Sequence, residues 1–109
     1  MIQIKNAAEL QKMRKACAIS AAALKAGGEA IEPGITSKQQ QIRPGDIVSI
    51  DTGCKIDGFN GDNACTYGCG KLDLEAQRLL DVTKESLHRG IEMARGGNRV
   101  GDIGHAVQT

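Results

Sequence analysis

The stretch that decides the fold is SIDTGCKIDGFNGDN, residues 49–63. At its centre, Asp57-Gly58 is a strong signal for the two-residue turn of a β-hairpin. Aliphatic β-formers precede the turn, from residue 47 on. The sequence therefore predicts two antiparallel strands within residues 46–67, with Ile56 opposite Phe59.

This hairpin would bring two aspartates together. Its register places Asp62 opposite Gly53, and Asp51 lies two residues from Gly53, so both carboxylates project from one face. Diagonal neighbours of this kind have Cα atoms ~7–8 Å apart. Carboxylates that share a space need a raised pKa or a cation, and oxygen ligands on strands suit Mg, Mn, Fe or Co. Asp51 and Asp62 are thus candidate metal ligands, although aspartates are also common at strand ends, and a register slip by one residue would separate them.

An amphipathic helix is predicted over residues 6–28. Asn6 and Glu9 form a capping-box pattern at its start, and Gly27-Gly28 are expected to end it. Its expected buried stripe is Leu10, Met13, Cys17, Ala21 and Leu24.

A second long helix is predicted within residues 72–97. Asp73 is a plausible N-cap and Gly96-Gly97 a plausible end. Its expected buried stripe is Ala76, Leu79, Leu80, Thr83, Leu87, Ile91 and Ala94. A third helix begins within residues 99–109, and the chain is expected to stop inside it.

Residues 32–46 contain an unusual connection. Thr36 and Gln39 form another capping-box pattern, but no apolar stripe follows before Pro44-Gly45. This segment is either a short polar loop or a junction from which a helix has been lost.

Composition excludes several classes of protein. The chain has 109 residues, which predicts one domain, and a net charge of +1 without a basic block, which argues against nucleic-acid binding. No apolar stretch approaches the ~20 residues of a membrane span, and the N-terminus lacks a signal-peptide pattern, so we expect a cytoplasmic protein. The four cysteines, Cys17, Cys54, Cys65 and Cys69, are expected to be free thiols, with a zinc site built around Cys65 and Cys69 as a minor alternative.

The segment GDIVSIDTGCKIDGFNGDNACTY, residues 45–67, resembles the type I methionine aminopeptidases, which are metallopeptidases of the pita-bread fold. Their hallmark is GDIV-x-ID-x-G followed by DG(F/Y)-x-GD. The first helix, the IEPGIT turn (31–36) and GNRVGDIGHAVQ (97–108) resemble the same family in the same order.

The resemblance implies an α+β fold, namely a partial pita-bread fold with an antiparallel hairpin and two long amphipathic helices. It implies a hydrolase that removes the N-terminal methionine of nascent proteins, acting on peptide N-termini. It also implies two divalent ions (Co, Mn, Fe or Zn) held by two Asp, one His and two Glu, and Asp51 and Asp62 match the two aspartates.

The chain departs from the family pattern in two places. Between ITSKQ and RPGDIV it lacks the family's helix, substrate pocket and HG-x-P histidine, and it ends before the GHG-x-G motif and both glutamates. We therefore expect residues 1–109 to form a single partial domain, internally deleted near residues 38–43 and truncated at its C-terminus. No catalytic residue is assigned, and His88 and His105 are expected to be ordinary helix positions. We expect the 109 residues alone not to catalyse, and the open sheet edge to favour self-association; the alternative function is a non-enzymatic remnant that binds a protein partner.

Overall fold

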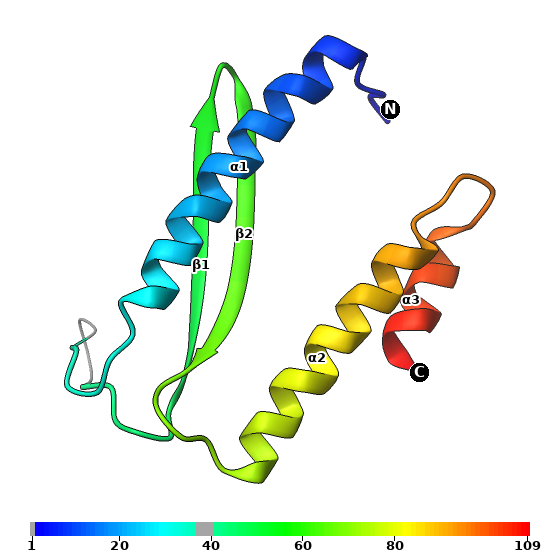
Figure 1. Cartoon of the computed structure of the whole chain (residues 1–109). Helices are drawn as coiled ribbons and strands as arrows, with labels where there is room; N and C mark the ends of the chain where they lie inside the picture. Colours follow the sequence, from blue (N-terminus) through cyan, green and yellow to red (C-terminus); the bar gives the residue numbers. More distant parts are fainter. Residues whose placement is uncertain (1, 37–40) are drawn as a thin grey trace. The chain divides into compact units, whose positions relative to one another are not determined.

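The computed structural model describes residues 2–36 and 41–109. These residues form α1 (Ala7–Glu29), β1 (Ile47–Ile56), β2 (Phe59–Gly68), α2 (Leu74–Met93) and α3 (Val100–Gln108), as Figure 1 shows. The chain divides into two compact units, Met1–Lys71 and Leu72–Thr109. The first unit combines a helix with an antiparallel sheet and the second is helical, so the predicted α+β class is confirmed.

The hairpin has the predicted register. Strands β1 and β2 pair antiparallel from Ile47↔Gly68 to Ile56↔Phe59, with Gly53 opposite Asp62. The turn residues Asp57 and Gly58 have φ values of 52° and 82°, which is the left-handed conformation that a type I′ hairpin turn requires. The Asp-Gly signal therefore fixed the pairing of both strands.

Helix α1 packs on one face of this hairpin through small residues. Its N-terminal capping box is confirmed, since Asn6 Oδ1 accepts from the Glu9 amide and Glu9 Oε2 accepts from the Asn6 amide. The expected buried stripe, however, is only partly correct. The buried positions are Ala16, Ser20 and Leu24, whereas Cys17 and Ala21 are exposed, as is Leu10 at 43%.

The face of α1 that packs on the sheet differs from the predicted apolar stripe, and polar contacts explain the difference. The Ser20 hydroxyl donates to the Thr52 carbonyl at 2.8 Å, and the Thr52 hydroxyl donates to the Ser20 carbonyl at 3.1 Å. The Cys54 thiol donates to the Ala16 carbonyl at 3.1 Å. A search for apolar periodicity gives serine no weight, although Ser20 is buried and forms two hydrogen bonds with Thr52.

Glycines allow this close approach. A Cβ on Gly61 of β2 would collide with the Ala16 carbonyl oxygen, and a Cβ on Gly28 would collide with the Tyr67 ring. The prediction that Gly27-Gly28 end the first helix is wrong, because the helix continues through both to Glu29. Those two glycines lie against the sheet instead.

The connection between α1 and β1 folds back on itself. The Gly34 amide donates to the Ile42 carbonyl at 3.0 Å, the Ile42 amide donates to the Ile35 carbonyl at 2.8 Å, and Thr36 pairs with Gln41. The second capping-box pattern involves Gln39 and so lies outside the described residues, as does part of the predicted junction at 38–43.

The second unit is a pair of helices. Asp73 is the N-cap of α2, as predicted, because its Oδ1 accepts from the Ala76 amide at 2.7 Å. The side chain of Gly90, a single hydrogen, lets α3 approach: a Cβ there would lie 2.7 Å from Val107 and 3.7 Å from Ile103. The predicted third helix is confirmed as α3.

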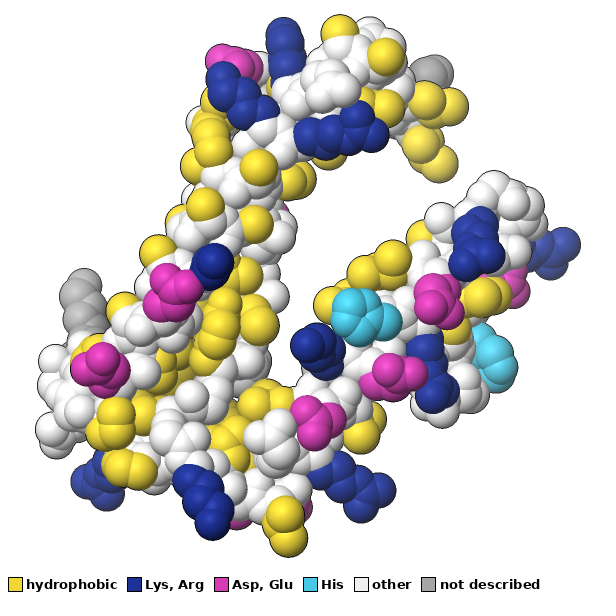
Figure 2. Space-filling model, in the orientation of Figure 1, with side chains coloured by type: hydrophobic (Ala, Val, Ile, Leu, Met, Phe, Trp, Pro, Cys, Tyr) yellow, Lys and Arg dark blue, Asp and Glu magenta, His cyan; other side chains and the backbone are white. Residues whose placement is uncertain are grey.

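The predicted buried stripe of α2 is largely wrong. Leu79, Leu87 and Ile91 are 56%, 59% and 60% exposed, while Gly90 is the buried residue of this helix. Within the second unit, α3 approaches α2 at Gly90, and it leaves these three apolar side chains of the stripe exposed. Apolar side chains accordingly remain on the surface of the chain (Figure 2).

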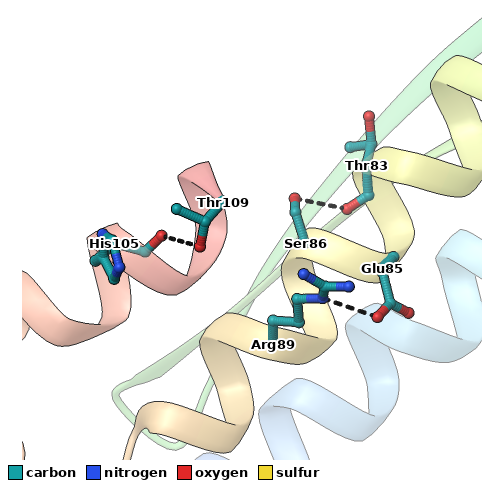
Figure 3. Close-up of polar contacts among 6 residues, drawn as sticks. All are labelled: Thr83, Glu85, Ser86, Arg89, His105 and Thr109. Carbon is teal, nitrogen blue, oxygen red and sulfur yellow. Dashed lines mark hydrogen bonds and ion pairs between the residues drawn. The ribbon is translucent and has the colours of Figure 1, made fainter.

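Polar contacts on the second unit are local (Figure 3). Arg89 Nε donates to Glu85 Oε1 at 2.9 Å within α2, and the Thr109 hydroxyl donates to the His105 carbonyl at 2.9 Å at the end of α3. Within the described ranges, no helix is both long and apolar enough to cross a membrane.

Candidate metal site

Asp51 and Asp62 lie on the same face of the hairpin. Along β1, exposed residues alternate with half-buried ones, and Asp51 is exposed, as are its neighbours two positions away. Asp62 lies opposite Gly53, and Asp51 lies opposite Ala64. The two aspartates are therefore diagonal neighbours on the face that α1 does not cover.

A side-chain contact confirms which residues share this face. Ser49 Oγ and Thr66 Oγ1 lie 2.8 Å apart across the ladder. This cross-strand pair is two residues along each strand from the pair formed by Asp51 and Ala64. Because side chains alternate along a strand, the residues two and four positions on point the same way. We call this surface the open face; its members are Ile47, Ser49, Asp51, Gly53, Lys55, Asn60, Asp62, Ala64, Thr66 and Gly68.

Gly53 leaves room between the two carboxylates. A Cβ at this position would meet only the Gly61 carbonyl oxygen within 4 Å, at an ordinary 3.9 Å, so the ladder itself does not demand glycine here. The missing side chain keeps the space beside Asp62 free. Carboxylate oxygens next to open space are a donor set that fits a hard or borderline divalent cation.

The described residues bring no third ligand to this pair. No group of three or more His, Cys, Asp or Glu residues capable of holding a metal occurs within residues 2–36 and 41–109. His88 and His105 are exposed on the helices of the second unit. All four cysteines are free thiols, with Cys65 exposed and Cys69 buried.

Sequence reasoning overlooked Lys55, the basic residue of the open face. Lys55 is exposed and lies opposite Asn60, two positions beyond Gly53. Strand alternation alone would have placed it on the face of Asp51 and Asp62. Four residues along a strand separate Lys55 from Asp51 by roughly 13 Å, which is too far for an ion pair within one hairpin.

Comparison with known proteins identifies the family of the chain. A sequence profile described as Metallopeptidase family M24 matches residues 37–109, two thirds of the chain and the part that contains both aspartates. The chain therefore belongs to metallopeptidase family M24.

The similar proteins are methionine aminopeptidases. "Methionine aminopeptidase 1" of Bacillus subtilis is 46% identical over 68 residues, which are 62% of this chain and 27% of that protein. The methionine aminopeptidase of Rickettsia prowazekii is 40% identical over 68 residues, 62% of this chain and 26% of that protein. Its crystal structure superposes with a TM-score of 0.94 at 25% identity, covering 99% of this chain and 61% of that chain. The sequence matches thus span about a quarter of these relatives, and the partial pita-bread architecture is confirmed.

Proposed function

We propose that this chain carries the two-aspartate part of a methionine aminopeptidase metal centre, with Asp51 and Asp62 as ligands of divalent ions such as Co, Mn, Fe or Zn. The observation that carries the proposal is the strand register, which makes the two aspartates diagonal neighbours on an uncovered face. Family membership and the names of the relatives support the reaction that we propose, the removal of an N-terminal methionine. Its setting, nascent proteins in the cytoplasm, is part of the proposal.

The residues have defined roles in this proposal. Asp51 and Asp62 hold the cation from two hydrogen-bonded strands, so the ladder rather than a flexible loop sets their spacing. Gly53 keeps the space between them open. A divalent ion supplies Lewis-acid chemistry, which polarises a scissile carbonyl and lowers the pKa of water.

Two carboxylates alone make a weak site. Each ligand that a site lacks also removes preorganisation, and the described residues add no further group to Asp51 and Asp62. We therefore propose that residues 1–109 bind metal but do not turn over substrate by themselves. Release of methionine from a Met-Ala-Ser peptide by the purified chain with Co²⁺ or Mn²⁺, abolished in Asp62→Ala, would overturn the second half of this proposal.

Calorimetric titration with Mn²⁺ or Co²⁺ tests the ligands. Binding heat should disappear in Asp51→Asn and in Asp62→Asn. Asp57→Asn is the matched control, because it removes the same charge from the same hairpin and asparagine tolerates the positive φ of that position. Equal binding by the wild type and Asp51→Asn would refute the assignment.

We also infer that a segment found in the relatives is absent between α1 and β1, near residues 38–43. In the Rickettsia protein, 68 residues are 26% of the length, so 109 consecutive residues would be less than half of it. The structural match, however, spans 61% of the solved chain. This difference supports the inference that the match bridges residues that this chain lacks. A nucleotide sequence that encodes the extra segment around codons 38–43 would contradict this inference.

A further inference from the structure

The outer edge of β1 has no strand beside it among the described residues, since the sheet has the order β1-β2. In a two-residue hairpin the pair next to the turn, here Ile56↔Phe59, is hydrogen-bonded, and such pairs alternate along the ladder. The even residues of β1 therefore bond to β2. The odd residues, from Ile47 to Lys55, direct their amide and carbonyl groups outward, which is a template for another strand.

The outward residues of this edge carry opposite charges. Asp51 and Lys55 both belong to the open face, and neither forms an ion pair within the part of the chain that the structure describes. They flank Gly53 symmetrically, two positions on either side. An antiparallel copy of the strand, turned about Gly53, would place each Asp51 opposite the other copy's Lys55.

We propose that two copies of this chain associate through their β1 edges, antiparallel, with Gly53 facing Gly53 and two Asp51–Lys55 ion pairs across the interface. Opposite charges facing each other across strands are favourable and like charges are unfavourable, so the pattern selects a register. This proposal does not rest on peptidase activity. It uses the Asp51 carboxylate in the metal-free chain, so a cation bound at Asp51 would compete with the ion pair.

Neighbouring registers are less favourable. Centring the pair on Asp51 would put two carboxylates face to face, and centring it on Lys55 would put two ammonium groups face to face. Centring it on Cys54 would oppose Asp51 to Asp57, and centring it on Thr52 would leave Asp51 opposite Gly53. Of these registers, the one centred on Gly53 alone pairs both charges.

The other face of the same pairing is apolar. In the register centred on Gly53, each Ile50 lies opposite the other copy's Ile56, and each Thr52 lies opposite the other copy's Cys54. Ile50 and Ile56 are half-buried in one copy and would gain cover from the second. The β2 edge offers no such match, because Asp62 is its one charged outward residue and no basic residue accompanies it.

Sedimentation equilibrium with EDTA present tests the proposal on the whole 109-residue chain. The wild type should form a dimer, whereas Lys55→Glu and Asp51→Lys should each weaken association about tenfold or more, since each turns two attractions into repulsions. Lys84→Glu on α2 is the control with the same charge change, and it should leave association unchanged. A wild type that stays monomeric at every concentration, or an undiminished dimer in Lys55→Glu, would overturn the proposal.

Mixing the two variants gives a sharper result. Each variant alone presents like charges, but a Lys55→Glu chain beside an Asp51→Lys chain would restore both ion pairs. A heterodimer should therefore form from two monomeric variants. Failure of the mixture to associate while the wild type dimerises would refute this register.

A disulfide trap measures the register directly, without charge changes. Gly53→Cys places one thiol opposite its own copy, where Cα atoms of a hydrogen-bonded pair lie ~5.5 Å apart, within disulfide range. Mild oxidation should give a covalent dimer in Gly53→Cys. It should not do so in Ser49→Cys, whose thiol would face Asp57, nor in the wild type. Equal cross-linking of Gly53→Cys and Ser49→Cys would refute the ordered pairing.

Discussion

Gly53 lies directly opposite Asp62 in the β1–β2 ladder, on the face away from α1. Glycine within a strand costs about 0.5–1 kcal/mol relative to alanine, and here no close contact requires it. In the proposed metal site, its role is to leave space next to the aspartate. Gly53→Val should raise the midpoint of urea unfolding and weaken Mn²⁺ binding. Loss of stability together with unchanged metal binding would show that the space has no such role.

Gly61, on the opposite face of the same hairpin, should behave in the reverse way. A Cβ there would collide with the Ala16 backbone of α1. We expect Gly61→Ala to lower the free energy of unfolding by about 1–3 kcal/mol or more. Gly53→Ala is the matched control, because it adds the same methyl group where there is room. Equal stability of the two variants in urea would contradict the packing of α1 on β2.

Tyr67 should titrate at unusually high pH. Burial raises the pKa of the Tyr67 phenol above its usual 10.0, and the negative charges of Cys65 and Glu29 add to this; its hydroxyl donates to the Leu24 carbonyl at 3.3 Å. Because the folded-state pKa is raised, this contribution to stability is complete below pH 10 and is lost as pH rises through the folded pKa.

Tyr67 is the one tyrosine of the chain, so absorbance at 295 nm follows it without interference. The native curve should lie to the alkaline side of the curve in urea, and Tyr67→Phe should remove the signal and flatten the loss of stability above pH 10. Coincident native and unfolded curves would refute the contact with α1.

Asp73 should stabilise the second unit. Its carboxylate caps α2, and Asp73→Ala should cost about 1 kcal/mol. The loss of helicity should show in circular dichroism at a lower temperature than in the wild type. Asp81→Ala, also on α2 but within the helix, is the control. A larger effect of Asp81→Ala than of Asp73→Ala would contradict the capping role.

The hairpin and its register could be predicted from sequence because one local signal, Asp57-Gly58, determines both. The faces of the helices could not be predicted to the same extent. Contact between α1 and the sheet selects Ala16 and Ser20 for small size and hydrogen bonding, neither of which apolar periodicity measures. On α2, Leu87 satisfies the periodicity but is 59% exposed. The sequence thus predicts that a helix has an apolar stripe. It does not predict which other element covers that stripe, because this depends on the tertiary structure.

The candidate site shows the same division. Parity and register are local, so the diagonal relation of Asp51 and Asp62 was within reach of sequence reasoning. Sequence reasoning overlooked the ion pair proposed between copies, although the signal was present. Strand alternation and the two-residue turn together place Lys55 on the outward edge of β1.

The central claim is that a divalent cation binds on the open face between Asp51 and Asp62. Paramagnetic broadening by substoichiometric Mn²⁺ in an amide-resolved NMR spectrum measures its position directly. The account predicts that the amide signals of Asp51, Gly53 and Asp62 broaden first, that those of α1 on the other side of the sheet broaden later, and that Asp62→Asn abolishes the pattern. Broadening centred on the acidic residues of α2, or unchanged by Asp62→Asn, would contradict it.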